Sequence, residues 1–270
     1  MTTFDFIPDL HGQSTKLEHG LHRLGWRRDP SGWRGPTPDR EIVFLGDFID
    51  RGPDNRGTLH LVRSLIDAGK ARAIMGNHEL NALQYHTVDP DDGRPLRPRS
   101  ERNTRQHASF LKEYPLGDPQ TREMLGWMQS LPMFLEHESF RAVHACWDES
   151  VIARLRALTP DGVLSDALLL RSAGRDPQDE TCALVEQTTK GPEHPLPQGY
   201  SFADKDGTRR RNVRLQWWNS GARTWRDIAM SVSDPSQLPQ EDLPDSLRQS
   251  IYPGSAKPVF FGHYWLRGAP

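Results

Sequence analysis

Five short apolar runs in this sequence end in the same way, and this pattern constrains the fold more than any other feature. Asp, Asn or His follows each run directly or after one Gly or Pro, and the five residues are Asp9, Asp47, Asn77, His144 and His263. Short β-branched and aromatic runs of this kind are typical of buried strands. Because ligands bind at the carboxyl ends of strands in open α/β sheets, we expect the five residues to meet at one site.

Helix signals fill the intervals between the first three strands. Thr15 and Glu18 have the spacing of a capping box, and Gly25 stands where that helix would end. Asp54 can cap a second helix that Gly69 closes. The expected apolar stripes are Leu17, Leu21 and Leu24 on the first helix and Leu59, Val62, Leu65 and Ile66 on the second. The chain therefore begins as a β-α-β-α-β unit of the α/β class.

The remainder of the chain is less regular in its signals, and we expect residues 1–270 to form one domain. The patterns predict two helices within 100–131, a largely helical stretch at 148–190, a Pro-rich loop at 191–199, a turn at 204–207, a strand at 211–218 and an irregular connection at 231–257. In that strand, alternation places Arg214 on one face and Val213 on the other. Residues 87–100 are expected at the rim of the site.

Composition excludes several classes of protein. The formal net charge is −2 and 26% of residues are charged, which gives no reason to expect a nucleic-acid partner. Cys146 and Cys182 lie far apart with no CxxC spacing, as in proteins of reducing compartments. No apolar run approaches the length of a membrane span, and the opening FDFI is too short for a signal peptide. We therefore expect a cytoplasmic protein with no membrane partner.

The side chains at the strand ends have the chemistry of a metal site. Asp9 and His11 are two positions apart, so both point to the same side of an extended segment. Together with the other four strand-end residues they offer oxygen and imidazole ligands but no thiolate, a set that suits Mn, Fe, Zn, Ni or Mg. Six ligands are too many for one tetrahedral ion and can serve two ions that share a carboxylate. Two such ions clamp the attacking and leaving oxygens of a phosphoryl transfer.

The motifs DLHG, GDFIDRG and GNHE, a later His and a final GH resemble those of the calcineurin-like metallophosphoesterases. The chain is most similar to the phosphoprotein phosphatase branch and its bacterial relatives, which include symmetrical dinucleoside tetraphosphatases. The resemblance implies two β-sheets packed face to face as a sandwich, with helices outside. The family has Gly where this chain has Pro8, and the chain ends seven residues after His263, so we expect a domain that is short at its C-terminal end.

The resemblance also implies a metal-binding role for each matching residue. Asp9, His11 and Asp47 would hold a first divalent ion, and Asp47 would bridge to a second. The second ion would be held by Asp47, Asn77, His144 and His263. Manganese is the expected ion, with iron, zinc, nickel and magnesium as alternatives.

Four residues within the motifs would bind the substrate or transfer protons. The planar guanidinium of Arg51 would hold the phosphoryl group, and Asn77 would contact the substrate as well as metal. His78 would be the general acid that protonates the leaving oxygen, and Asp50 would orient its ring and raise its pKa. The nucleophile would be a hydroxide that bridges the two ions, so no phosphoenzyme is needed.

Three functions remain open at this point. The preferred one is hydrolysis of phosphomonoesters, on a protein or a small molecule. The first alternative is a dinucleoside polyphosphate hydrolase, which needs a longer pocket with an aromatic platform, for which Trp217 and Trp218 beside the arginines are the candidates. The second alternative is a non-catalytic relative that binds metal or phosphate. A second phosphate-binding arginine is expected before the final His, without a way to choose it from the sequence.

The remaining histidines are expected to lie on the surface or in the core without a role in the site. They are His19, His22, His60, His86, His107, His137 and His194. Residues 102–107 are expected to form a surface helix. Glu79 is expected to position the loop of GNHE, and Cys146 and Trp147 are expected to pack in the core.

Overall fold

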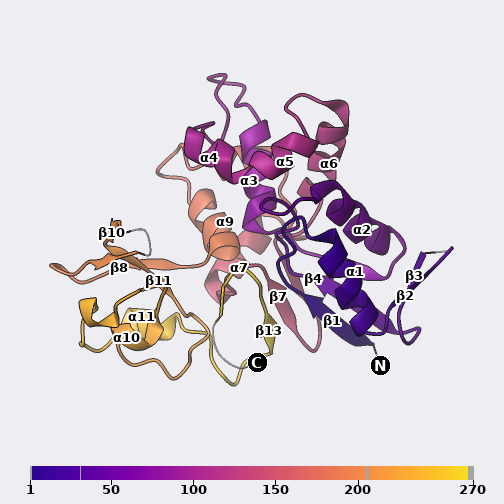
Figure 1. The fold of residues 1–270 in the computed structure, drawn as a ribbon. Helices are drawn as coiled ribbons and strands as arrows, with labels where there is room; N and C mark the ends of the chain where they lie inside the picture. Colours follow the sequence, from indigo (N-terminus) through magenta and orange to yellow (C-terminus); the bar gives the residue numbers. More distant parts are fainter. Residues whose placement is uncertain (1, 31, 205–206, 267–270) are drawn as a thin grey trace.

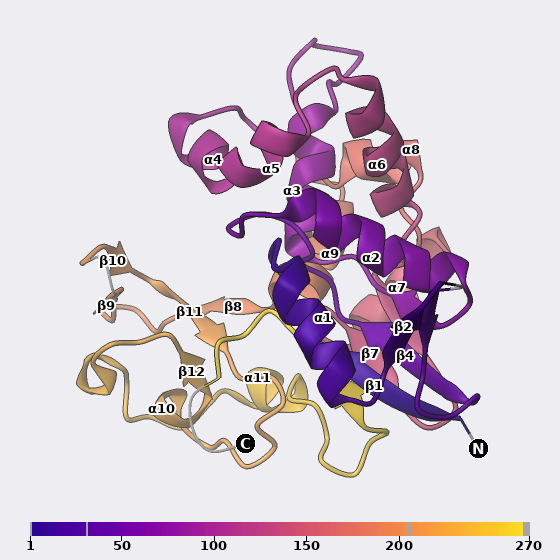
Figure 2. The ribbon, with the colours of Figure 1, turned by 45° about the vertical axis from the view of Figure 1, so that its right-hand side comes forward.

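The computed structural model describes residues 2–30, 32–204 and 207–266. Figure 1 shows the strands β1, β4 and β7 in the lower part of the molecule, the helices α3 to α6 above them, and a lobe that contains β8 and β11 to one side. Figure 2, a view turned by 45°, shows α1 and α2 running across the sheet that contains β1 and β4. The lobe again lies beside this sheet, away from α2.

The regular elements alternate along the first half of the chain and become shorter in the second half. The strands are β1 Thr3–Ile7, β2 Arg27–Asp29, β3 Gly32–Arg34, β4 Arg40–Phe44, β5 Ala71–Ala73, β6 Phe134–Glu136, β7 Arg141–Val143, β8 Glu193–Pro195, β9 Phe202–Ala203, β10 Arg209–Arg210, β11 Asn212–Leu215, β12 Ala229–Met230 and β13 Val259–Phe260. The helices are α1 Ser14–Arg23, α2 Asn55–Asp67, α3 Asn77–His86, α4 Glu101–Gln106, α5 Ala108–Glu113, α6 Pro119–Gln129, α7 Glu149–Leu158, α8 Asp166–Arg171, α9 Thr181–Lys190, α10 Trp225–Ile228 and α11 Asp245–Gln249, with a 3₁₀ turn η1 at Pro235–Gln237.

Each of the five predicted strands is present, and they divide between two sheets. One sheet has the order β1-β4-β5 and is parallel throughout, which confirms the β-α-β-α-β opening. The other has the order β13-β7-β6, with β13 parallel and β6 antiparallel to β7. A short hairpin of β2 and β3, which the sequence analysis did not predict, lies between α1 and β4.

The two sheets face each other across a small apolar layer. Val43 and Ile74 from the first sheet and its connections pack with Phe140 and Ala142 around the second. Phe6 of β1 stacks on Phe260 of β13, with ring centroids 3.5 Å apart. This layer makes the pair of sheets a β-sandwich, and the larger core lies between the sheets and the helices outside them. The predicted fold class is therefore confirmed.

The lobe that contains β8 to β12 has a hydrophobic cluster of its own, which includes Phe202, Val213 and Trp225. The strand β11 alternates as predicted, with Val213 buried and Arg214 partly exposed. The Pro-rich loop predicted at 191–199 is wrong in part, because β8 pairs with β11 in an antiparallel ladder. The turn predicted at 204–207 lies partly outside the described residues.

The helix boundaries follow capping interactions, and one expected cap is wrong. The side chain of Asp54 caps α2 by accepting a hydrogen bond from Gly57 N at 2.8 Å, as predicted. No Thr15–Glu18 capping box forms at α1, because the N-cap is Gln13 and the helix begins at Ser14, two residues earlier than predicted. The Ser14 hydroxyl donates to the second oxygen of Asp54, so the starts of α1 and α2 are joined. Gly25 follows Leu24, the C-cap of α1, and has a φ of 92°, as a glycine at the end of a helix often does.

Among the helices of the described residues, none combines the length and the apolar character needed to cross a bilayer.

The two helices predicted within 100–131 are three in the structure, because His107 separates α4 from α5. The stretch 148–190 contains α7, α8 and α9, as its pattern predicts.

Replacing Asp54 tests the junction of α1 and α2. Asp54→Ala removes the cap of α2 and also leaves Ser14 without its partner, so we expect a loss of about 2 kcal/mol in the free energy of unfolding. The matched control is Asp118→Ala, which removes the cap of α6 alone and should cost about 1 kcal/mol. Urea unfolding of both variants in the presence of a metal chelator measures the difference. Equal losses would contradict the proposed double role of Asp54.

Candidate active site and metal centre

The six residues expected to bind metal lie together at the carboxyl ends of the central strands. Asp9 and His11 follow β1, Asp47 follows β4 and Asn77 begins α3 directly after β5. His144 follows β7, and His263 follows β13. The structure therefore brings residues from both sheets of the sandwich to one place, although they span almost the whole chain.

The carboxylate of Asp47 lies at the centre of this group and is nearly inaccessible, with 2% of the residue exposed. Its Oδ1 is 3.3 Å from His144 Nε2, and its Oδ2 is 3.8 Å from His11 Nε2. In the described part of the chain, two sets of possible ligand atoms lie within 4.8 Å of one another: His11, Asp47 and His78, and Asp47, His144 and His263. Asp47 belongs to both sets, which is the arrangement that a shared ligand of two ions requires.

Asp9 and Asn77 complete the two sides of the centre. Asp9 Oδ2 is 3.8 Å from His11 Nε2, while Asp9 Oδ1 accepts a hydrogen bond from the backbone N–H of His263 at 2.9 Å. Asn77 Oδ1 lies 3.1 Å from His144 Nε2 and 2.8 Å from His263 Nδ1. Asp9 is absent from the tightest set around His11, in which His78 takes its place.

Backbone carbonyls orient two of the histidine rings. His11 Nδ1 lies 3.0 Å from the carbonyl oxygen of Ile49, and His144 Nδ1 lies 2.6 Å from that of Leu45. A ring that donates through Nδ1 presents the lone pair of Nε2, as second-sphere partners of metal-bound histidines do. His11 Nε2 and His263 Nε2 are buried and have no hydrogen-bond partner within the described residues. Buried polar atoms are seldom left unpaired, so these two nitrogens fit a metal centre.

The backbone at the site is held in conformations that most residues avoid. Six non-glycine residues in the described part of the chain have positive φ, and five of them belong to the site. These five are His11, Asp47, Asp50, Arg51 and His263. A left-handed residue other than Gly costs free energy and is found where function or a ligand requires it.

Two glycines in the motif GDFIDRG allow this path. Gly46 has φ of 91°, and a Cβ there would lie 2.5 Å from the backbone N of Gly76. A Cβ on Gly52 would lie 2.1 Å from the carbonyl oxygen of His11. Any larger side chain at either position would push apart the loops that carry the ligands.

The side chain of Glu79 forms hydrogen bonds with the backbone of the loops that carry Asp47 and Gly76. The residue is fully buried, and its carboxylate accepts hydrogen bonds from the backbone N–H groups of Asp47, Phe48 and Gly76 at 2.8, 2.8 and 2.9 Å. Burial raises the pKa of Glu79 to about 7, and the neighbouring charge of Asp47 acts in the same direction. The predicted structural role of Glu79 in positioning the loop fits these contacts.

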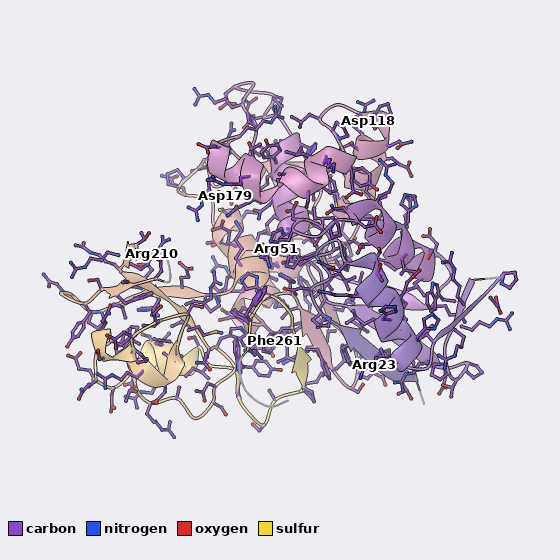
Figure 3. The ribbon with its side chains drawn as sticks, viewed as in Figure 1. Arg23, Arg51, Asp118, Asp179, Arg210 and Phe261 are labelled. Carbon is purple, nitrogen blue, oxygen red and sulfur yellow. The ribbon has the colours of Figure 1, made fainter. Side chains whose placement is uncertain are left out.

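His78, Asp50 and Arg51 form a second group next to the metal centre. His78 Nδ1 lies 2.6 Å from Asp50 Oδ2, and His78 Nε2 lies 3.4 Å from a guanidinium nitrogen of Arg51. Burial lowers the pKa of His78, but the charge of Asp47 and the hydrogen bond with Asp50 outweigh it, so the pKa lies above its usual value. Figure 3 shows Arg51 near the middle of the molecule, below the helices α3 to α5, whereas Arg210 lies far out on the lobe.

A further histidine lies next to Asp50. The sequence analysis expected a surface helix at 102–107, and this prediction is wrong for the position of His107, which is buried. The residue is 5% exposed, and its Nδ1 lies 2.8 Å from Asp50 Oδ1. Its position between α4 and α5 follows from tertiary packing, for which the local sequence carries no signal.

The site opens into a cleft with a volume of about 650 Å³. Arg51, Arg97, Arg105 and Arg214 line it, together with the metal-centre residues Asp47, Asn77 and His263. Arg97 belongs to the segment 87–100 that was expected at the rim of the site. Arg214 precedes the final His, as the expected second phosphate-binding arginine does.

The aromatic residues that line the cleft, Tyr85 and Trp265, are not those predicted. Trp217 is 2% exposed and donates its indole N–H to the carbonyl of Ala145, so a platform for a base at Trp217 is wrong. Trp218 packs on Phe261 and is not part of the cleft lining. Trp265 lines the cleft instead, with 80% of the residue exposed.

A family model described as calcineurin-like phosphoesterase matches residues 2–264 of the chain. The chain belongs to this family. The predicted family is therefore confirmed, and the paired Asp and His sets around Asp47 fit the dinuclear divalent metal site that the family has.

Two bacterial tetraphosphatases are among the curated relatives. The chain is 30% identical over 145 residues to a symmetrical bis(5'-nucleosyl)-tetraphosphatase of Janthinobacterium sp. (strain Marseille), a match that covers 54% of this chain and 43% of the relative. It is 40% identical over 74 residues to an asymmetrical bis(5'-nucleosyl)-tetraphosphatase, PrpE, of Oceanobacillus iheyensis, which covers 27% of this chain and 29% of the relative. The chain thus spans less than half the length of each of these relatives.

Solved structures of phosphatases show a more distant similarity. A cold-active protein tyrosine phosphatase of a psychrophilic Shewanella species is 21% identical, with a TM-score of 0.43. The match covers 70% of this chain and 56% of that structure.

Replacing Glu79 tests whether it holds the site loops together. In Glu79→Gln, the amide can accept at only one of its two terminal atoms, so at least one of the three buried N–H donors loses its acceptor. We expect a loss of about 1 to 3 kcal/mol in the free energy of unfolding, measured by urea titration of the metal-free protein. The control is Glu123→Gln, which alters an exposed ion pair with Arg63 and should change stability by less than about 0.5 kcal/mol. A Glu79→Gln variant as stable as the parent would rule out this role.

Proposed function

We propose that this protein is a metal-dependent hydrolase of phosphate esters. The observation that carries the proposal is the contact between the two groups of the site, in which His78, Asp50 and Arg51 stand directly beside the carboxylate of Asp47. His78 Nε2 is 3.9 Å from Asp47 Oδ2. A proton donor and a guanidinium are thus within reach of any phosphoryl group bound at the metal centre, as hydrolysis of a phosphate ester requires.

The proposed metal ligands are the six residues gathered around Asp47. They are Asp9, His11, Asp47, Asn77, His144 and His263. When bound, two divalent ions would supply the positive charge that activates water and neutralises the phosphoryl oxygens. The carboxylate, amide and imidazole donors suit manganese, with iron, zinc, nickel or magnesium as alternatives.

The chain's own residues then orient the ester and supply a proton. Arg51 would hold the phosphoryl oxygens with its planar fork, and Asn77 would contact them from the opposite side. As water adds to phosphorus and the bond to the leaving oxygen breaks, His78 would give the proton on Nε2 to that oxygen. Asp50 holds the other ring nitrogen, so it keeps Nε2 directed at the cleft. The water contributes its proton to solvent, and His78 is reprotonated from solvent.

A purely binding role is the less economical interpretation of the same residues. A module that only binds metal or phosphate needs the ligands of the ions and a cation for the anion. It has no use for a histidine whose pKa is raised by Asp47 and Asp50. Pro8 precedes Asp9 without displacing it from the site, because Asp9 still lies 3.8 Å from His11 Nε2.

The preferred substrate from the sequence is a phosphomonoester, and the shape of the cleft supports a second candidate, a dinucleoside polyphosphate. Arg97 lines the cleft and is held by three neutral amide oxygens, of Asn81, Asn103 and Gln106, at 3.0, 3.1 and 3.3 Å. Within the described residues it has no ion pair, so its charge is available to an anion. With Arg214 and the exposed Trp265 in the same cleft, a phosphate chain and a base would each find a partner. The names of the tetraphosphatase relatives agree with this candidate.

Three broader predictions from the sequence remain proposals. We propose that residues 1–270 act as one domain, although the lobe has a hydrophobic cluster of its own. We also propose a cytoplasmic location and a phosphate ester as the partner molecule, without nucleic acid.

Competition between two substrates separates the candidates. We expect the Mn-loaded protein, given equal amounts of p-nitrophenyl phosphate and diadenosine tetraphosphate, to hydrolyse at least one of them. Nitrophenol and phosphate as the first products would favour the monoesterase, and nucleoside phosphates would favour the dinucleotide hydrolase. Hydrolysis of neither would contradict the proposed function.

A variant of Arg97 locates the second candidate in the cleft. Arg97→Gln should raise KM for diadenosine tetraphosphate about tenfold, which corresponds to about 1.4 kcal/mol of binding, and leave KM for p-nitrophenyl phosphate within about twofold. The matched control is Arg102→Gln, on the same segment but exposed and outside the cleft lining. Equal changes in KM for both substrates would exclude Arg97 as a contact specific to the phosphate chain.

A further inference from the structure

Asp50 binds a second histidine in addition to the one used in the proposed mechanism. Its Oδ2 lies 2.6 Å from His78 Nδ1, and its Oδ1 lies 2.8 Å from His107 Nδ1. The carboxylate is therefore placed between two imidazole rings, one at each oxygen. Both histidines line the cleft, and His107 is the more buried of the two, with 5% of the residue exposed.

The ring of His107 is fixed from several sides. It stacks on Phe110 with centroids 4.8 Å apart and an interplanar angle of 23°. Its Nε2 lies 3.3 Å from His86 Nε2, so the second ring nitrogen is also paired. The backbone N–H of His107 bonds to the carbonyl of Asn103 at 3.1 Å, at the junction of α4 and α5. A ring held in this way offers Asp50 a donor in a defined position.

Asp50 needs such a partner more than an ordinary aspartate does. It is 2% exposed and has a left-handed backbone with φ of 68°. Its backbone N–H is held by Asn55 Oδ1 at 2.7 Å, but this bond does not fix the side chain. Rotation of a carboxylate about its last torsion is soft, so hydrogen bonds alone set its plane. Without His107, Oδ1 would be a buried acceptor with no partner, and the carboxylate would turn away from His78 to find one.

We propose that His107 is a positioning residue for the general acid, which holds the carboxylate of Asp50 so that His78 directs Nε2 at the leaving oxygen. This inference rests on the proposed phosphoester hydrolysis, with His78 as the acid. The ring of His107 is paired with Asp50 and His86, neither of which is a proposed metal ligand, so we expect it to act through Asp50. Second-sphere hydrogen bonds of this kind are what keep a catalytic side chain in productive geometry.

The alternative role for His107 is packing alone, between Phe110 and Asp50. The two roles differ in how the effect of a substitution depends on the leaving group. The leaving group of phenyl phosphate is a strongly basic oxyanion, so its hydrolysis depends on the general acid. The leaving group of 2,4-dinitrophenyl phosphate is a stable anion, so its hydrolysis does not. A packing defect slows the hydrolysis of both esters alike, because it disturbs the whole site.

Two substitutions of His107 separate the hydrogen bond from the ring. His107→Phe keeps the aromatic stacking on Phe110 and removes the donor to Asp50. His107→Asn keeps an N–H donor near the position of Nδ1 and removes the ring. The control is His60→Phe, at an exposed position of α2. All variants are compared as the Mn-loaded chain of residues 1–270, with metal content and thermal unfolding measured in parallel.

We expect His107→Phe to lower kcat for phenyl phosphate by about 10- to 100-fold, part of the effect that a general acid supplies. The same variant should keep kcat for 2,4-dinitrophenyl phosphate within about threefold and retain the metal content of the parent. His107→Asn should recover most of the loss with phenyl phosphate. In a His78→Asn background, His107→Phe should have no further effect on either ester, because positioning acts only through the acid.

Three results would overturn the inference. An equal loss with both esters, or a loss with His107→Asn as large as with His107→Phe, would show a packing role. A further loss in the His78→Asn background would show that His107 acts on something other than the acid. Absence of hydrolysis of either ester by the parent would remove the proposed function itself, and is recognised because it precedes any substitution.

Discussion

The structure depends on keeping the carboxylate of Asp47 charged in a place where water scarcely reaches it. An isolated buried carboxylate would take up a proton or unfold its surroundings. Here His11, His78 and His144 surround the carboxylate. Burial acts to raise the pKa of Asp47, but the attraction of these histidines outweighs it and holds the pKa far below its usual range. The same imidazole nitrogens and carboxylate oxygens fit the donor set of the proposed metal centre.

The loops around Asp47 are held in strained conformations by the rigid elements beneath them. Asp47 itself has φ of 55°, and its carbonyl accepts hydrogen bonds from the backbone N–H groups of Leu10 and His11. Glu79 fixes the same loop from the other side through three backbone donors. Two sheets packed through Phe6, Phe140 and Phe260 keep these loops in register. The strained backbone at the site is therefore held both by hydrogen bonds among the loops and by the packing of the two sheets.

Much of the site could be predicted because its residues follow apolar runs directly, so local pattern fixes both the strand and the side chain at its end. The cap of α2 was predictable for the same reason, since Asp54 acts on the next turn. His107 could not be predicted in this way, because it meets Asp50 through the packing of segments 57 positions apart. Arg97 was expected only as part of the segment 87–100 at the rim, and Trp265 was not predicted although it lies two residues after His263. The prediction for Trp217 was wrong because the alternation of polar and apolar residues shows which face of a strand and its continuation is buried, but not which residues pack on that face. The start of α1 was missed because Ser14 pairs with Asp54, 40 positions away.

The most direct test of the account is anomalous X-ray scattering at the manganese edge from crystals of the Mn-loaded protein. The account predicts two peaks about 3.5 to 4 Å apart, both in contact with the carboxylate of Asp47, with His11 on one side and His144 and His263 on the other. In Asp47→Asn, at least one of the peaks should disappear while the fold persists. A single peak in the parent, two peaks that do not share Asp47, or an unchanged pair of peaks in Asp47→Asn would contradict the account.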